Sequence, residues 1–192
     1  MTSNHEGTNL IEPRTALLIG MIVAAAALRL LPHPMNFTPV GALALFGGAS
    51  FRSKRMALAL PLVSLFAGDI FVGLHRLMPY VYASFLVSVA IGFWLRRNRS
   101  VVRVGAGVLA GAIQFFLVTN FALWAASIGA YPKTPAGLAA CYIAGIPDFW
   151  NTLAGDAFYS AVLFGGLALI EHRFPGLRER MATLRPQAHR MV

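Results

Sequence analysis

The chain has 192 residues, of which 57% are hydrophobic and only 12% are charged. A soluble domain of this length cannot bury so many apolar side chains in one core, so the composition excludes an ordinary soluble protein and indicates an integral membrane protein. In a soluble chain the net charge of +9 would suggest nucleic-acid binding, but in a membrane protein its meaning depends on which loops carry it.

Six apolar stretches are candidates to cross a hydrocarbon core of about 30 Å, which takes roughly 20 residues. The second is short and rich in glycine, so it must tilt, thin the bilayer or be partly broken. Residues 136–146 are too short to span and predict an interfacial or re-entrant helix. The six predicted spans cover residues 15–31, 37–51, 56–73, 80–95, 104–128 and 149–170.

The sequence therefore predicts an all-α integral membrane protein with six transmembrane helices over residues 15–170. A cytoplasmic N-terminal segment, residues 1–14, and a basic cytoplasmic tail, residues 171–192, flank this domain. The first apolar stretch could instead be an export signal that is cleaved near residues 24–27. Its length and the charge pattern that follows favour a retained helix.

Basic residues alternate between rich and poor loops along the chain. With six crossings and the N terminus inside, every Lys and Arg lies on one side of the membrane except Arg29, Arg76 and Lys133. The positive-inside rule then places both termini in the cytoplasm.

Polar and aromatic residues gather in the outer half of the predicted bundle. Because polar groups are costly inside a membrane, they mark a candidate ligand pocket that opens to the outside. Asp69 and Asp156 could instead be structural carboxylates paired with arginine or helix N termini, and the aromatic residues could form an interfacial belt. The candidate substrate-binding residues are His33, Asn36, Asp69, His75, Tyr80, Tyr82, Asn120, Trp124, Trp150, Asn151 and Asp156.

Catalytic motifs are missing from the sequence. It has no His-Glu-x-x-His zinc motif, no Gly-x-Ser-x-Gly elbow and no Walker loop, so we predict a protein that is not an enzyme and has no intrinsic cofactor. The alternatives are a membrane enzyme that acts on a lipid or quinone through Asp69 and His75, and a scaffold without a ligand. Cys141 is the only cysteine, which excludes an intrachain disulfide and a cysteine metal site.

Two stripes of small residues can bring helices into close contact. Ala16, Gly20 and Ala24 recur every four residues on the first helix, where docking of a partner and internal packing are equally compatible with the pattern. Gly107 and Gly111 form a second stripe, for which internal packing is favoured.

Four segments read together resemble a family of small bacterial membrane proteins. They are Leu-Pro-His-Pro-Met-Asn-Phe-Thr-Pro-Val at 31–40, Gly68-Asp69 with Gly73-Leu74-His75, Thr-Asn-Phe-Ala-Leu-Trp at 119–124, and Ile-Pro-Asp-Phe-Trp-Asn-Thr-Leu-Ala-Gly-Asp at 146–156. This family is similar to the substrate-binding S components of energy-coupling-factor (ECF) vitamin transporters, and within them to the BtuM-type cobalamin proteins.

The resemblance implies a six-helix S-component bundle in the bacterial inner membrane, with an outward-facing site for cobalamin or a related corrinoid. It also implies a coupling subunit with two cytoplasmic ATPases as partners, docked on the face of Ala16, Gly20 and Ala24. Some BtuM proteins supply a cysteine as axial cobalt ligand near the third and fourth helices, where this chain has none. His75 would be the substitute, because imidazole is a good cobalt ligand.

Overall fold

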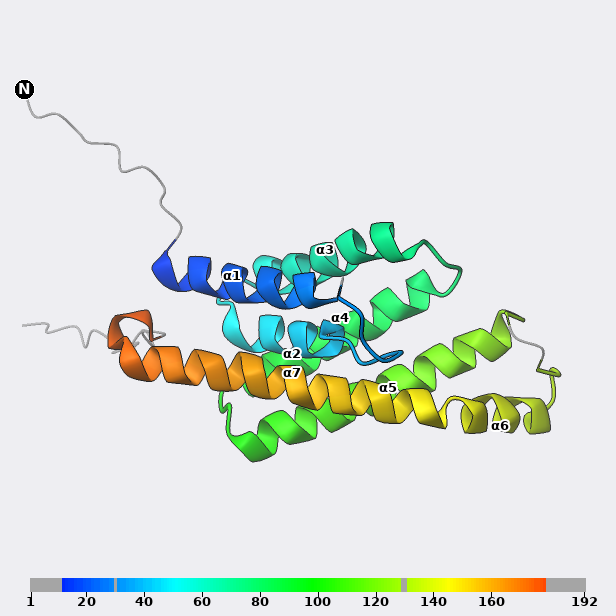
Figure 1. The fold of residues 1–192 in the computed structure, drawn as a ribbon. Helices are drawn as coiled ribbons and strands as arrows, with labels where there is room; N and C mark the ends of the chain where they lie inside the picture. Colours follow the sequence, from blue (N-terminus) through cyan, green and yellow to red (C-terminus); the bar gives the residue numbers. More distant parts are fainter. Residues whose placement is uncertain (1–11, 30, 129–130, 179–192) are drawn as a thin grey trace, which may run out of the picture.

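The computed structural model describes residues 12–29, 31–128 and 131–178, and within these ranges the chain is helical and contains no β-strand (Figure 1). The all-α prediction is confirmed. Most of the predicted N-terminal segment, and the predicted tail from residue 179 onward, lie outside the described residues. The helices are α1 (Pro13–Leu28), α2 (Val40–Ser50), α3 (Lys54–Val72), α4 (Met78–Leu95), α5 (Val101–Ala125), α6 (Pro135–Ala144) and α7 (Ile146–Arg173), followed by a 3-10 turn at Pro175–Leu177.

Three helices, α4, α5 and α7, have the length and the apolar composition needed to cross a membrane. The shorter helices α1, α2 and α6 are apolar as well, and α3 has 19 residues with charged side chains near both ends. The lengths and compositions of these helices are compatible with a membrane protein. Helix α6 continues the line of α7 beyond one end of the bundle, as Figure 1 shows, in agreement with the short helix predicted before the last span.

Helix α2 is the centre of the bundle, and every one of its residues is buried. It contacts α1, α3, α4, α5 and α7, and it is apolar all round, as expected for a helix surrounded by protein. Its 11 residues span only about 16 Å, so it cannot cross the hydrocarbon core alone. The preceding segment is kept out of the helix by three prolines, Pro32, Pro34 and Pro39. Such irregular backbone is tolerated at membrane depth where it lines a cavity.

Helices α2 and α4 approach closely at a pair of glycines. A Cβ on Gly48 would overlap the carbonyl oxygen of Val89 and lie 2.9 Å from the Cα of Gly92. A Cβ on Gly92 would overlap the carbonyl oxygen of Leu45 and lie 2.8 Å from the Cα of Gly48. Only glycine at both positions permits this contact between the two backbones.

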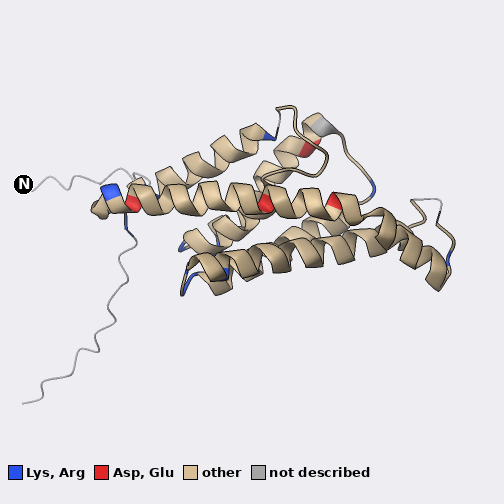
Figure 2. Cartoon of the chain, turned by 60° about the horizontal axis from the view of Figure 1, so that its bottom comes forward, with Lys and Arg blue, Asp and Glu red and all other residues tan. Residues whose placement is uncertain are grey.

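Arginine side chains join the helix ends at one end of the bundle. Arg14, at the start of α1, donates to the carbonyl of Ser50 at 2.9 Å and to Glu171 near the end of α7 at 3.3 Å. Arg96, just after α4, donates to the carbonyl of Gly48 at 2.8 Å. Figure 2 shows the blue Lys and Arg positions concentrated at this end, which is called the basic end below.

The two stripes of small residues have different surroundings. Gly107 and Gly111 are buried against α4 and α2, so they pack inside the bundle as favoured from the sequence. Ala16, Gly20 and Ala24 are exposed, because α1 turns its Leu18, Ile22 and Ala25 face toward the core. In the described part of the chain, and apart from the adjoining backbone of α1, no atom lies within 4 Å of a Cβ built on Gly20. The first stripe is thus a free surface of the described structure.

Candidate functional site

A cavity of about 380 Å³ lies at the end of the bundle opposite the basic end, next to the first residue of α2. It forms there because α2 does not extend to this end of the bundle. Here α3, α4, α5 and α7 enclose a space that no central helix fills. The lining residues are Arg29, Asn36, Thr38, Val40, Leu65, Asp69, His75, Leu77, Val81, Phe85, Ala112, Phe115, Phe116, Thr119, Asn120, Leu123, Asp148, Phe149 and Thr152.

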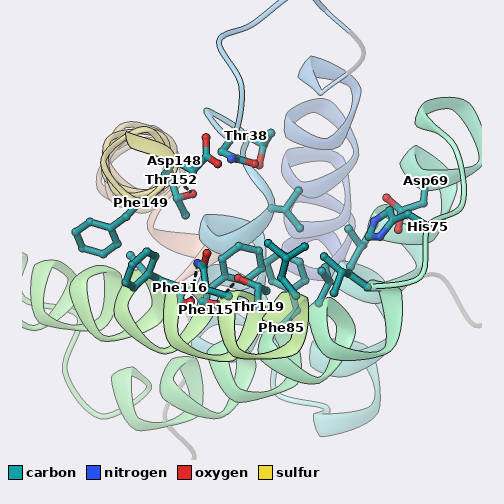
Figure 3. A pocket seen from close by; sticks show the side chains of 18 of the residues that line it. Thr38, Asp69, His75, Phe85, Phe115, Phe116, Thr119, Asp148, Phe149 and Thr152 are labelled. Atoms are coloured by element: carbon teal, nitrogen blue, oxygen red, sulfur yellow. Dashed lines mark hydrogen bonds between the residues drawn. The ribbon is translucent and has the colours of Figure 1, made fainter. Parts of the chain in front are cut away.

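The walls of this cavity differ in chemistry. Figure 3 shows Asp148 and Thr152 on one side, from α7, and Asp69 and His75 on the opposite side. Between these two sides, α5 contributes a floor that includes Phe115, Phe116 and Thr119. The cavity therefore combines aromatic surface with polar groups that converge from several helices, which is typical of small-molecule sites.

The wall near α3 is held by an ion pair. Arg29 donates to Oδ1 of Asp69 at 2.7 Å and to the carbonyl of Leu65 at 3.1 Å, and the Tyr82 hydroxyl donates to Oδ2 of Asp69 at 2.9 Å. The Asp69 side chain is 3% exposed. Both of its oxygens are occupied by protein donors, so this network ties α1, α3 and α4 together at the edge of the cavity.

Asp156 caps the central helix. Its Oδ1 accepts a hydrogen bond from the backbone N–H of Ala42 at 3.1 Å, in the first turn of α2. A Cβ on Gly41 would overlap the carboxylate, so glycine is needed for this approach. A carboxylate at a helix N terminus pairs with unsatisfied N–H groups and with the helix dipole. Asp156 is buried and borders a small adjoining cavity of about 40 Å³, so its contacts favour the structural alternative weighed from the sequence.

Three polar side chains on the cavity walls donate hydrogen bonds to their own helices. The Thr119 hydroxyl donates to the carbonyl of Phe115 at 2.8 Å, and the Thr152 hydroxyl donates to the carbonyl of Asp148 at 2.9 Å. The Asn120 amide nitrogen donates to the carbonyl of Phe116 at 2.9 Å. Each bond reaches back four residues, a local pattern common for such side chains in helices.

Comparison with known proteins adds a family to this geometry. The family of unknown function DUF6580 matches residues 9–178, which include all seven helices and the cavity. The chain belongs to this family. No curated protein and no solved structure matches it.

In this DUF6580 protein four of the predicted binding residues line the cavity: Asn36, Asp69, His75 and Asn120. Tyr82 acts behind the wall through Asp69, and Asp156 acts through α2. Within the described residues, the other five predicted side chains are not part of the lining: His33, Tyr80, Trp124, Trp150 and Asn151.

The residues outside the lining have other roles. His33 is exposed, and its ring nitrogens lie 2.9 Å from the carbonyl of Pro34 and 3.2 Å from that of Arg29, so it shapes the turn after α1. Trp124 donates to the carbonyl of Pro132 at 2.8 Å and lies under the Lys133 ammonium, so it links the end of α5 to the residues just before α6. Tyr80 and Trp150 are exposed on the bundle surface, as expected for an interfacial aromatic belt.

The cavity is also lined by residues outside the predicted set: Arg29, Thr38, Asp148, Thr152 and the phenylalanines. A signal for several of them exists in the sequence. Asp148 and Thr152 are four residues apart, as are Phe115 and Thr119, and such pairs share one helix face.

In the part of the chain that the structure describes, no three or more His, Cys, Asp or Glu side chains come together to hold a metal ion. His75 is the one histidine among the described residues that line the cavity. Cys141 is buried in α6 and contacts the carbonyl of Asn120 at 3.4 Å.

Proposed function

We propose that this DUF6580 protein is the substrate-binding component of an ECF-type uptake system and takes up a small, vitamin-like solute. The observation that carries the proposal is the polar and aromatic cavity at the end of the bundle remote from the basic end. A binding protein needs such a cavity, and a transporter that relies on separate ATPases needs no nucleotide site of its own.

The proposed topology follows from the charge at the two ends. Under the positive-inside rule the basic end faces the cytoplasm of a bacterium, so the cavity opens to the outside. The chain crosses the inner membrane six times. In the second crossing, residues 31–39 and the central helix α2 together span the membrane. Both termini then lie in the cytoplasm.

The size of the cavity restricts the solute. Ligand cavities are typically about 300–1,000 Å³, so 380 Å³ suits a compact molecule with one or two rings. A corrinoid, with its macrocycle and nucleotide tail, is larger than this. Cobalamin, the ligand implied by the BtuM resemblance, would require the wall of Asp69 and His75 to move outward, and the exposed His75 would then reach the cobalt.

The alternative of an enzyme acting on a lipid or quinone gains little from the geometry. It requires Asp69 to exchange a proton with a substrate, whereas both oxygens of Asp69 already accept hydrogen bonds from Arg29 and Tyr82. The scaffold alternative predicts a cavity that binds nothing, which the following measurement tests.

Ligand-induced stabilisation tests the proposed function. We expect at least one compound from a panel of vitamins, cobalamin included, to raise the melting temperature of the purified protein, because a ligand at 100 times its Kd stabilises the folded state by about 2.7 kcal/mol. Thr152→Leu places a larger apolar side chain in the cavity and should remove the shift. Ala154→Leu, at an exposed position of the same helix, should retain it. A wild-type protein that no vitamin stabilises would contradict the proposal.

The exposed stripe on α1 is the proposed surface for the coupling subunit. Gly20→Leu should reduce uptake of the ligand more than about tenfold in cells that express the complete transporter, because a bulky side chain blocks close helix contact. The ligand-induced shift of the purified protein should not change, since Gly20 has no neighbour within 4 Å. Gly165→Leu, at an equally open position on α7, is the control and should transport normally. Unchanged uptake by Gly20→Leu would place the coupling surface elsewhere.

A further inference from the structure

The hydrogen-bonding groups of the cavity point to the chemistry of its ligand. A hydroxyl group has one hydrogen. Thr119 and Thr152 donate this hydrogen to backbone carbonyls of their own helices. Their oxygens can therefore only accept hydrogen bonds from a ligand. Asn120 donates one of its two amide hydrogens to the carbonyl of Phe116. The two threonine oxygens thus favour a ligand that donates hydrogen bonds.

The acidic residues of the cavity differ in their partners. Asp69 is paired with Arg29 at 2.7 Å, so these two charges offset each other. Asp148 lies in the first turn of α7 and is partly buried, and none of the described residues donates a hydrogen bond or an ion pair to its carboxylate. Figure 3 shows it on the side of the cavity opposite Asp69. Among the described residues that line the cavity, Asp148 is thus the acidic residue whose carboxylate has no protein partner.

Aromatic rings form another part of the cavity lining. The rings of Phe116 and Phe149 have their centroids 5.3 Å apart, and Phe115 extends the aromatic surface along α5 toward Phe85, at 5.5 Å. The face of an aromatic ring carries negative charge density and attracts cations within about 6 Å of its centroid. Aromatic surface, accepting oxygens and an unpaired carboxylate all favour the same kind of ligand group.

We infer that the solute is an organic cation, whose charged or N–H-bearing nitrogen pairs with Asp148 and whose ring or methyl groups pack against Phe116 and Phe149. This inference rests on the proposed function and names the substrate class of the same cavity. A ligand with a negative charge would meet Asp148 without an available arginine, because Arg29 is held by Asp69 and the carbonyl of Leu65.

The test compares cationic probes with neutral and anionic ones of similar size. Thiamine, choline and 1-methylnicotinamide are the cations, nicotinamide, riboflavin and cyanocobalamin are neutral, and biotin and pantothenate are anions. We expect at least one cation to bind by calorimetry and to raise the melting temperature, and 1-methylnicotinamide to bind more tightly than nicotinamide. If only neutral or anionic compounds bind, the inference is wrong while the proposed function stands. If none of the eight binds, both fail.

Three variants locate the cation. Asp148→Asn keeps the shape of the side chain and should weaken binding of the cation about tenfold to a hundredfold, because a charged hydrogen-bond partner is lost. Phe116→Leu keeps apolar area without a ring face and should weaken it about threefold to tenfold. Glu171→Gln removes a carboxylate at the basic end and should leave the affinity unchanged. For each variant, the rise in melting temperature is measured relative to the same variant without ligand. Equal affinity of wild type and Asp148→Asn for the cation would overturn the assignment.

Discussion

Gly48→Ala is expected to destabilise the fold by about 3 kcal/mol, at the upper end of the usual cost of overpacking. The added methyl group would overlap the Val89 carbonyl oxygen and crowd the Gly92 backbone, and neither can rotate away as a side chain would. Helices α2 and α4 must then separate along their contact. Thermal unfolding of the purified protein, followed by circular dichroism, measures the loss.

The reciprocal variant and a control sharpen this prediction. Gly92→Ala places its methyl group in the same contact, so the double variant should lose less than the sum of the two single losses, because the helices separate only once. Gly105→Ala adds a methyl group at an exposed position of α5, where no described residue outside the adjoining helix backbone lies within 4 Å, and should stabilise by about 0.5–1 kcal/mol. Equal melting temperatures for Gly48→Ala and Gly105→Ala would show that the close approach of α2 and α4 is not needed.

The positions of the helices could be predicted well from the sequence. Apolar runs bounded by prolines and arginines gave the fourth span as residues 80–95 and the last as 149–170, against Met78–Leu95 and Ile146–Arg173 in the structure. The differences lie at the ends, where polar residues such as Asp148 and His172 lower the apolarity although the backbone continues its helical hydrogen bonds. Hydropathy depends on the side chains, whereas the end of a helix is the point where its backbone hydrogen bonds stop.

The central position of α2 could not be predicted in the same way. Lipid tails are as apolar as leucine side chains, so an apolar run reads the same whether it faces lipid or protein. From the sequence, the glycines of the second span indicate only a short helix that can be partly broken. Gly48 instead matches Gly92 in another helix, a relation between distant residues that no single stretch of sequence contains.

The predicted set of site residues coincides only in part with the lining of the cavity. Clusters of polar residues indicate which helix ends meet, and they identified Asn36, Asp69, His75 and Asn120. They do not fix the rotation of a helix, and successive residues differ by about 100° around its axis. On α7 the predicted binding residues therefore include Trp150, whereas the nearby Asp148 and Thr152 line the cavity.

The ion pair at the cavity wall gives the second large expected effect. Arg29→Met should destabilise the protein by about 3–5 kcal/mol, because it leaves the buried Asp69 carboxylate without its cation. Arg29→Lys keeps a positive charge but cannot also reach the Leu65 carbonyl in the same geometry, so it should lose about 1 kcal/mol. Arg76→Met, at an exposed arginine between α3 and α4, should stay within about 0.5 kcal/mol of the wild type.

The double variant Arg29→Met with Asp69→Asn decides whether the loss comes from the unpaired charge. When both charges are removed, Tyr82 can still donate to the asparagine carbonyl oxygen, and most of the stability should return. The coupling in this double-mutant cycle should reach about 1–3 kcal/mol. Additive losses would mean that Arg29 stabilises α3 through the Leu65 carbonyl and its own packing. A coupling energy of that size would instead mean that the ion pair between Arg29 and Asp69 holds α1 and α3 together at the wall of the cavity. Any larger ligand that moves this wall must then break the ion pair.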